Sequence, residues 1–403
     1  MKDSHDPPPN AQGTAPGWRE LYHGGSPEAE QAHFRDLADV IVGLQRTNKK
    51  KSGSQISRRT FHAKIVVGVD NAELAFRTDL PPSLRAGDFT AGARLPAIVR
   101  LSNASGTIRP DSTADLRGAA LKIALPSGDK HDLLMTSYPV SHARDATQFV
   151  QIARIGAGPK PLVLPRMLGS FGPSETARIL GNLRQANRPS ASLALESYWS
   201  RGAVLWGHAG PVRFRLSPLS GPVPPTTPPP DPADRLQTDF ATRLSESPIR
   251  FALHIQKYVS EKLTPIENGA VEWKEGDSPW HAVATLTLPT QNILSPKGLT
   301  TRDHVDTLAF NPWHAPATFR PLGNLNRARR TVYAASASEW NASLQAHRLS
   351  AKNLRAAADR RSCSSARTVQ VSSRELTSRS VHQLKWTRQG FRHASTGYDE
   401  LSE

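Results

Sequence analysis

Apolar residues recur at three- and four-residue intervals between residues 27 and 45, which is the spacing of one face of a helix. From residue 60 to about residue 289, short apolar segments alternate instead with turns rich in Gly, Pro, Asp and Asn. Many short, evenly spaced strands are typical of an antiparallel barrel. The pattern therefore predicts an α+β protein whose main part is an antiparallel β-barrel with helical insertions.

The barrel strands are expected in nine segments of the chain, which helices interrupt. These strands are 60–68, 71–78, 95–102, 117–125, 130–137, 201–208, 211–217, 249–257 and 280–288. Helical insertions are expected at 143–155 and 174–187, and a helix at 233–246 follows the proline-rich connector 217–234. The sequence Val-Asp-Asn-Ala at 69–72 indicates a hairpin between the first two strands.

Three parts of the chain differ in composition and periodicity. Residues 1–54 are an N-terminal arm that holds the helix and a basic linker. Residues 55–345 are the barrel core, in which 290–324 has few periodic signals and is expected to wrap irregularly around the barrel. Residues 346–403 are basic and rich in Ser and Arg, and we expect them to be a tail without regular structure.

Composition limits the classes of function. Hydrophobic residues make up 37% of the 403 residues, so we expect a small core for this length. A net charge of +16 allows contact with anionic ligands, and contact of the basic tails with nucleic acid or membrane is the weaker hypothesis. The single Cys363 excludes an intrachain disulfide. Because the chain shows neither an apolar run of transmembrane length nor an apolar signal region, we expect a cytoplasmic protein.

One predicted helical turn, at 325–333, carries an unusual pair of side chains. Arg329 and Tyr333 are four residues apart, so they lie on the same helix face. A guanidinium next to a phenol favours the phenolate, which is a hard oxygen ligand suited to ferric iron. The same spacing also occurs in ordinary amphipathic helices, so its interpretation depends on the rest of the chain.

Four upstream stretches give this pair a context. They are 59–64 (RTFHAK), 98–103 (IVRLSN), 115–122 (DLRGAALK) and 132–149, which begins DLLMTSYP. In this order, and followed by the Arg329 and Tyr333 helix, they resemble the haem catalase superfamily over roughly residues 55–340. The resemblance is strongest to the shorter catalase-related proteins, and it implies a catalase-like barrel that binds haem b with its iron.

The resemblance also implies roles for the residues near the iron. His62 is similar to the distal histidine, which moves a proton between the two oxygens of a peroxide substrate. Ser102 corresponds to a residue that supports this histidine through a hydrogen bond. Tyr333 corresponds to the proximal ligand of the iron, and Arg329 to its charge partner.

Other positions of the resemblance concern the rest of the cofactor. Arg59 and Arg100 correspond to residues that bind the haem propionates, because a guanidinium pairs well with a carboxylate. Phe149 corresponds to an aromatic residue that packs against the haem face. Members of the family are commonly homo-oligomers, so the resemblance implies a homo-oligomer here as well.

The chain departs from the family at the position that holds the peroxide. Thr136 and Ser137 replace two asparagines, so one rotating hydroxyl stands in for an amide donor. We therefore count Thr136 among the catalytic residues but expect weak disproportionation of hydrogen peroxide. Peroxidase turnover, or rearrangement of a fatty-acid hydroperoxide, is favoured instead.

Further departures surround the same site. Phe61 stands where the family has a small residue, so it narrows the pocket or shields the haem. Ser141 and His142 replace two phenylalanines, which makes the distal wall more polar. Ala337 and Trp340 stand near the places of the family's usual His and Arg after the tyrosine.

Three functional hypotheses remain open from the sequence. The first is a haem enzyme that acts on peroxides, and the second is a haem-binding relative with little catalysis, such as a sensor or haem store. Oxygen evolution from peroxide separates these two. The third is a basic protein that binds nucleic acid or membrane through an inactive barrel, for which salt-dependent retention on DNA is the test.

Overall fold

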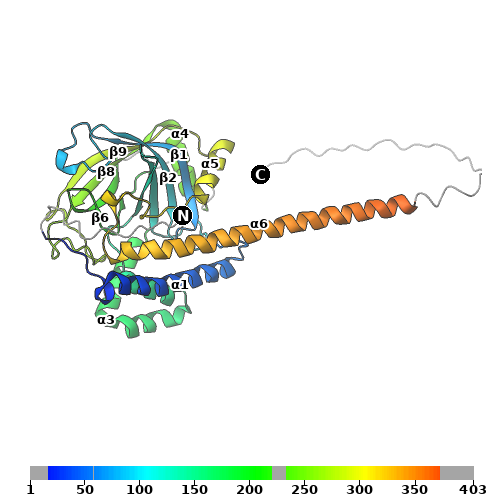
Figure 1. The fold of residues 1–403 in the computed structure, drawn as a ribbon, viewed down its shortest axis with the longest axis horizontal. Helices are drawn as coiled ribbons and strands as arrows, with labels where there is room; N and C mark the ends of the chain where they lie inside the picture. Colours follow the sequence, from blue (N-terminus) through cyan, green and yellow to red (C-terminus); the bar gives the residue numbers. More distant parts are fainter. Residues whose placement is uncertain (1–16, 58, 220–232, 373–403) are drawn as a thin grey trace, which may run out of the picture. The chain divides into compact units, whose positions relative to one another are not determined.

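The computed structural model describes residues 17–57, 59–219 and 233–372 (Figure 1). The chain divides into two compact units, Met1–Gln345 and Ala346–Glu403. None of the helices in the described part of the chain combines the length and the apolar character that a membrane span requires.

A closed antiparallel barrel forms the centre of the first unit. Its strands are β1 (Lys64–Phe76), β2 (Arg94–Asn103), β3 (Arg117–Ala124), β4 (Lys130–Thr136), β5 (Tyr198–Trp199), β7 (Pro211–Pro218), β8 (Ile249–Lys257) and β9 (Trp280–Leu288). They are hydrogen-bonded in the order β5-β4-β3-β2-β1-β9-β8-β7, and a pairing of β5 with β7 closes the ring. The short strand β6 (Val204–Leu205) is added to β7. The predicted antiparallel β-barrel and α+β class are therefore confirmed.

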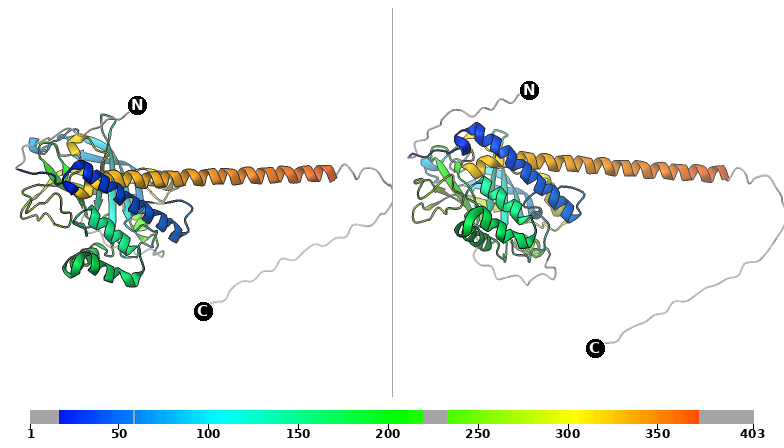
Figure 2. Two further views of the ribbon diagram at one scale, coloured as in Figure 1. Left: turned by 60° about the horizontal axis from the view of Figure 1, so that its bottom comes forward. Right: turned by 90° about the horizontal axis from the view of Figure 1, so that it is seen from below.

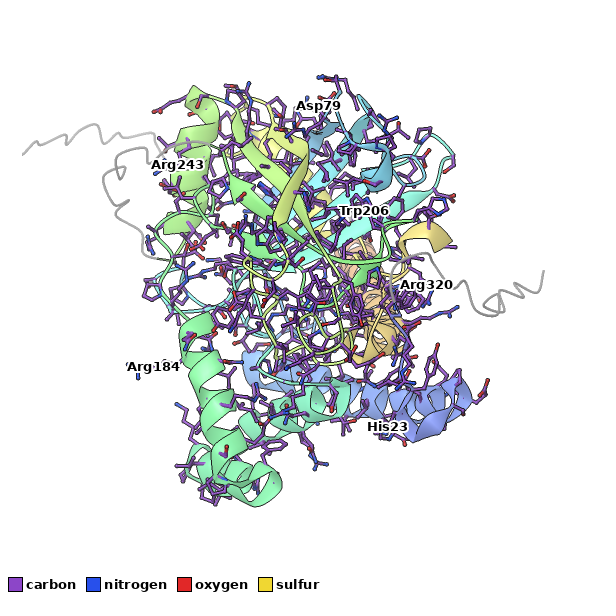
Figure 3. The ribbon with its side chains drawn as sticks, turned by 90° about the vertical axis from the view of Figure 1, so that its left-hand side faces the viewer. His23, Asp79, Arg184, Trp206, Arg243 and Arg320 are labelled. Atoms are coloured by element: carbon purple, nitrogen blue, oxygen red, sulfur yellow. The ribbon has the colours of Figure 1, made fainter. Side chains whose placement is uncertain are left out.

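The barrel interior is filled with apolar and aromatic side chains. Trp206 is fully buried, and its ring lies 5.3 Å from that of Phe89 and 5.2 Å from that of Phe319, centroid to centroid. Its indole N–H donates to the carbonyl of Leu84 at 2.8 Å, so this buried polar atom is satisfied. Figure 3 shows Trp206 among the inner side chains of the barrel.

The hairpin predicted at 69–72 is wrong, because β1 runs through this segment as one strand. Val69 pairs with Val99 and Ala72 pairs with Ala97, so β1 uses one more residue than β2 over this interval. The extra residue makes a β-bulge, which bends a strand without ending it. The Asp-Asn pair is thus accommodated within a strand. The strand expected at 201–208 is likewise reduced to the two residues of β6.

Helices surround the barrel and connect its strands. They are the α-helices α1 (Pro27–Ser52), α2 (Ala146–Gly156), α3 (Lys160–Ala186), α4 (Arg235–Glu246), α5 (Pro296–Thr307) and α6 (Asn324–Ser372), with the 3₁₀ turns η1 (His23–Gly25), η2 (Pro82–Leu84) and η3 (Ala317–Phe319). The predicted insertions correspond to α2 and to part of α3, and the predicted helix after the proline-rich connector corresponds to α4.

Helix α1 begins and ends with strong local signals. Ser26 caps its start by accepting from the Ala29 N–H at 3.1 Å, and Gly53 ends it in the left-handed conformation at φ 63°. The basic run 46–51 therefore belongs to the helix rather than to a linker. Helix α1 lies beside the first part of α6 (Figures 1 and 2), where Gln45 donates to the Ser336 carbonyl at 3.1 Å.

Two expectations about the second half of the chain need correction. Residues 290–324 are not irregular throughout, because α5 begins at Pro296 with Ser295 as its cap. Because Val305 is the only buried side chain of α5, the sequence of this helix has no periodic apolar face that would predict it. Residues 346–372 continue α6 instead of forming a tail without regular structure, because 324–372 contains neither Gly nor Pro. Residues 373–403 lie outside the described part of the chain.

A buried ion cluster fixes the start of α6. The Arg327 guanidinium donates to Glu30 at 2.6 Å, to Glu20 at 2.8 Å and to Glu267 at 2.9 Å. Burial opposes its charge, but the hydrogen bonds to Glu30 and Glu267 raise the pKa of Arg327 above its usual range. We call these four residues the Arg327 cluster. It ties α6 to α1 and to two loops, and so positions the residues that follow on α6.

Candidate active site

A cavity of about 390 Å³ lies within the first unit. One face of α6 lines it, because the contributing residues recur every three or four positions. These are Leu325, Ala328, Arg329, Val332, Tyr333, Ser336, Ala337 and Trp340, and Ala334 beside them also contributes. The ends of β2, β3 and β4 and the segment before β1 supply further lining, and α1 and α2 add apolar side chains.

All eight residues that the sequence analysis proposed for the site line this one cavity. They are Arg59, His62, Arg100, Ser102, Thr136, Phe149, Arg329 and Tyr333. Their positions extend over more than half of the chain, so the fold brings them together. Their roles stay predictions.

His62 is held in an uncommon backbone conformation. Its φ of 58° is the only positive value for a residue other than glycine in the described ranges, and its N–H donates to the Ala104 carbonyl at 2.9 Å. The ring atom Nδ1 lies 3.0 Å from the Ser102 hydroxyl. Burial, followed by the positive charge of Arg100, lowers the pKa of His62 from 6.5 to about 3. The imidazole is therefore neutral at pH 7.

Gly118 on β3 makes room for this imidazole. A Cβ atom at this position would lie 2.5 Å from two atoms of the His62 ring and 2.9 Å from the Ser102 hydroxyl. Real Cβ atoms do not approach neighbours so closely, so no other residue fits here without moving the ring. The backbone of β3 therefore forms a cradle for His62.

The pair on α6 points to the same cavity. The Arg329 guanidinium lies 5.9 Å from the centre of the Tyr333 ring, and it donates to the Asn326 side chain at 3.1 Å. Asn326 is itself buried and donates to the Ala203 carbonyl at 2.7 Å. The Arg329 side chain is therefore anchored at one point while it remains next to the phenol.

Arg59 and Arg100 share a carboxylate that the sequence analysis missed. Asp306 on α5 lies 3.0 Å from Arg59 and 2.9 Å from Arg100. Arg59 also stacks on the Trp340 ring at 4.5 Å. The Nε of Arg100 is buried and has no hydrogen-bond partner in the part of the chain that the structure describes. No signal in the sequence pointed to Asp306, because α5 itself was not expected.

Arg201 is a second residue that sequence reasoning missed. Its Nε donates to the Thr136 hydroxyl at 2.9 Å, and both side chains line the cavity. Burial, followed by the positive charge of Arg329, lowers the pKa of Arg201 to about 10. The sequence places Arg201 two residues before the apolar run 203–206, and this position alone does not identify it as a site residue.

Aromatic side chains close another part of the site. The Phe149 ring lies 5.6 Å from Phe61 in an edge-on arrangement and 5.1 Å from His142. Phe61 lines the cavity and is 36% exposed, so it stands between the cavity and solvent. Burial, followed by the charge of Arg201, lowers the pKa of His142 to about 3.

The donor set of the cavity suits a haem. A phenol is available for iron, and a neutral imidazole is available for a peroxide. The lining contains four arginines and, within the described ranges, neither Asp nor Glu. These are Arg59, Arg100, Arg201 and Arg329. Asp306 pairs with only two of them, and among the described residues the buried Nε of Arg100 has no partner, so the lining fits a ligand with two carboxylates.

Comparisons with known proteins concern the fold rather than these residues. No protein-family model and no curated sequence matches the chain. A fungal catalase matches with a TM-score of 0.54 and 17% identity, over 71% of this chain and 59% of its own length. Catalase A from Saccharomyces cerevisiae matches with 0.56 and 17%, over 84% of this chain and 70% of its own length.

A bacterial catalase gives a similar result, with a TM-score of 0.54 and 14% identity over 84% of this chain and 67% of its own length. The chain thus spans only 59% of the fungal catalase. Identities this low carry information about architecture and not about activity. The closed barrel and these three likenesses together show that the protein has a catalase-like fold.

Proposed function

We propose that the protein is a haem-binding oxidoreductase that acts on hydrogen peroxide or on organic hydroperoxides. One observation carries this proposal. A phenol beside a guanidinium, Tyr333 with Arg329, shares a single cavity with a neutral histidine that Ser102 holds. The catalase-like fold supports it, because the same chemistry is known on that fold.

The residues that would hold the cofactor follow from the lining. The Tyr333 oxygen would bind the iron, and Arg329 would stabilise the phenolate. Arg59 and Arg100 would pair with the two carboxylates of the haem. These pairs would replace part of the contact that both arginines make with Asp306. A bound haem would supply the electron chemistry that side chains lack.

His62 would handle the proton in this reaction. Because its pKa is lowered to about 3, its imidazole is unprotonated at neutral pH and has a free ring nitrogen that can serve as an acceptor. In the tautomer with hydrogen on Nδ1, this atom donates to the Ser102 hydroxyl at 3.0 Å and leaves Nε2 as the acceptor. Ser102 thus orients the imidazole, and the cradle at Gly118 fixes the plane of its ring.

The surroundings of Thr136 favour organic hydroperoxides or peroxidase turnover over rapid disproportionation. Its hydroxyl already accepts a hydrogen bond from Arg201 and has only a long contact, 3.4 Å, to the Tyr138 carbonyl. It can therefore donate one hydrogen bond to a ligand but cannot replace an amide with two donors.

The first prediction tests the iron ligand. Tyr333→Phe removes the phenol oxygen and keeps the ring, so haem-loaded variant and wild type should differ in absorption spectrum. Tyr138→Phe is the matched control, because its hydroxyl donates to Gln185 and does not line the cavity. We expect the control to keep the wild-type spectrum.

Three results separate the functional hypotheses. An unchanged spectrum in Tyr333→Phe would contradict the ligand assignment. A wild-type protein that binds haem through Tyr333 but consumes neither hydrogen peroxide nor an organic hydroperoxide would be a haem store or sensor. Failure of the wild type to bind haem would overturn the proposal as a whole.

A further inference from the structure

Arg201 has a buried guanidinium that is only partly used by the protein. The residue is 8% exposed and lines the cavity. Its Nε donates to Thr136, but in the described ranges neither Nη1 nor Nη2 makes a hydrogen bond or an ion pair. Burying a charge without a counter-charge costs free energy, and an anionic ligand bound to this guanidinium would reduce that cost.

Two of the other three cavity arginines differ from Arg201 in this respect, whereas Arg329, in the described ranges, likewise has one hydrogen bond to a neutral side chain and no ion pair. Arg59 and Arg100 share Asp306, and Arg329 contacts Asn326 and the Tyr333 ring. Under the proposed function, the first two would also meet the haem carboxylates, and the third would meet a phenolate. Among the described residues of the lining, Arg201 is then the one arginine to which no negative group is assigned.

We propose that Arg201 forms a binding site for a monocarboxylate inside the cavity. With Nε engaged, Nη1 and Nη2 remain as a two-pronged donor that matches the two oxygens of a carboxylate. The Thr136 hydroxyl oxygen accepts from the Arg201 Nε, and as a donor it has only the Tyr138 carbonyl oxygen, 3.4 Å away. It can therefore give the ligand a third hydrogen bond.

The rest of the lining selects the class of anion. Leu134, Met135, Leu325 and Val332 offer apolar surface in the same cavity, and a single unassigned cation matches a single negative charge. An organic monocarboxylate satisfies both features, whereas a multiply charged oxyanion such as phosphate would leave charge uncompensated. The carboxylate belongs either to a free small acid or to a hydroperoxide substrate.

Binding is tested first by calorimetry on the full-length protein without added haem, so this arm does not rest on the proposed function. Propionate is the probe, and propionamide is its neutral counterpart of equal size. We expect wild type to bind propionate at least about tenfold more tightly than propionamide, because only the anion pairs with the guanidinium. Equal binding of both, or binding of neither, would overturn the proposal.

Variants then assign the effect to Arg201. Arg201→Gln keeps a donor for Thr136 but removes the charge, and should weaken propionate binding about tenfold or more. Arg201→Lys keeps the charge, so its affinity for propionate should lie between that of wild type and that of Arg201→Gln. Arg213→Gln is the matched control, because Arg213 is 4% exposed and stacks on Trp273 outside the cavity. If this control loses propionate binding as Arg201→Gln does, the site is not at Arg201.

A second experiment, on the haem-loaded protein, distinguishes a free acid from a hydroperoxide substrate as the source of the carboxylate. This experiment rests on the proposed function. A hydroperoxy fatty acid and its methyl ester serve as the two substrates. A KM for the acid lower by about tenfold or more, with competition by propionate, indicates that the carboxylate belongs to the substrate. Equal KM values with propionate still bound indicate a free acid. If neither of these two substrates nor hydrogen peroxide reacts, the proposed function fails while the calorimetric result stands.

Discussion

Arg327 and Arg329 are two residues apart on α6, yet their electrostatic surroundings are opposite. Arg327 is buried among three carboxylates, from Glu20, Glu30 and Glu267. Arg329 faces a cavity whose lining, in the described ranges, includes three more arginines and no carboxylate. The same residue type is therefore fully paired on one side of the helix and unpaired by any carboxylate of the lining on the other.

The comparison teaches how charge is divided between holding the fold and binding a ligand. Inside the Arg327 cluster every charge has a partner within hydrogen-bonding distance, so its effect is structural. Around the cavity, four arginines of the described ranges share one carboxylate, that of Asp306, so positive charge remains available to a ligand. The three predictions below alter these two regions in turn.

The largest effect is expected from Arg327→Met. The change leaves three buried carboxylates without their shared cation, and breaking a buried pair in this way typically costs about 3–5 kcal/mol. Urea unfolding measures the loss. Arg330→Met is the control, because this exposed guanidinium only stacks on Trp313 at 5.2 Å, and we expect a loss of about 1 kcal/mol or less. Similar losses in both variants would show that the cluster is not structural.

A smaller loss is expected from Gly118→Ala, which alters the shape of the cavity and not its charge. The new Cβ would collide with the His62 ring and the Ser102 hydroxyl, and overpacking of this kind costs about 1–3 kcal/mol. Gly181→Ala in α3 has open space around the new atom and should be neutral or more stable by about 1 kcal/mol. A Gly118→Ala protein as stable as this control would refute the cradle.

The smallest effect concerns pH. Well above pH 6.5, His62 is neutral in both the folded and the unfolded chain and contributes almost nothing to the pH dependence of stability. Because its folded pKa is lowered to about 3, only the unfolded chain takes up a proton as the pH falls from 6.5 toward 3. The free energy of unfolding should therefore fall by up to about 1.4 kcal/mol per pH unit from this group.

His62→Gln removes that contribution. Between pH 7 and pH 5, the free energy of unfolding of the variant should fall by about 1–2 kcal/mol less than that of wild type. Between pH 8 and pH 7 the difference between the two proteins should stay constant, which serves as the internal control. A wild type and variant with parallel pH profiles down to pH 5 would mean that the imidazole is not neutral in the folded protein.

The barrel could be predicted from the sequence because its signal is local. Alternation along each strand and turn residues between strands are visible without knowing any partner. The bulge in β1 was misread because Asp70-Asn71 makes the same local pattern in a turn, and only the pairing with β2 distinguishes the two. Helix α5 was missed for the opposite reason, because it buries a single side chain and has no periodic face.

The same distinction between local and long-range signals applies to the residues of the candidate site. Residues inside short motifs, such as His62 and Tyr333, could be named from the sequence because a resemblance identified their positions. Arg201 and Asp306 could not be named, because each matters only through a partner distant in sequence. Arg201 meets Thr136 across 65 positions, and Asp306 meets Arg100 across 206. Contacts of that kind exist only after the chain has folded.

The left-handed backbone at His62 has a consequence for which residue evolution would retain at this position. Holding a residue with a side chain at a φ of 58° costs roughly 1–2 kcal/mol, which Gly or Asn would largely avoid. Selection for thermal robustness alone would therefore replace this histidine. A lineage that keeps it accepts a less robust protein in return for what the imidazole does, so retention or loss of this side chain among natural variants would report whether the chemistry is still in use.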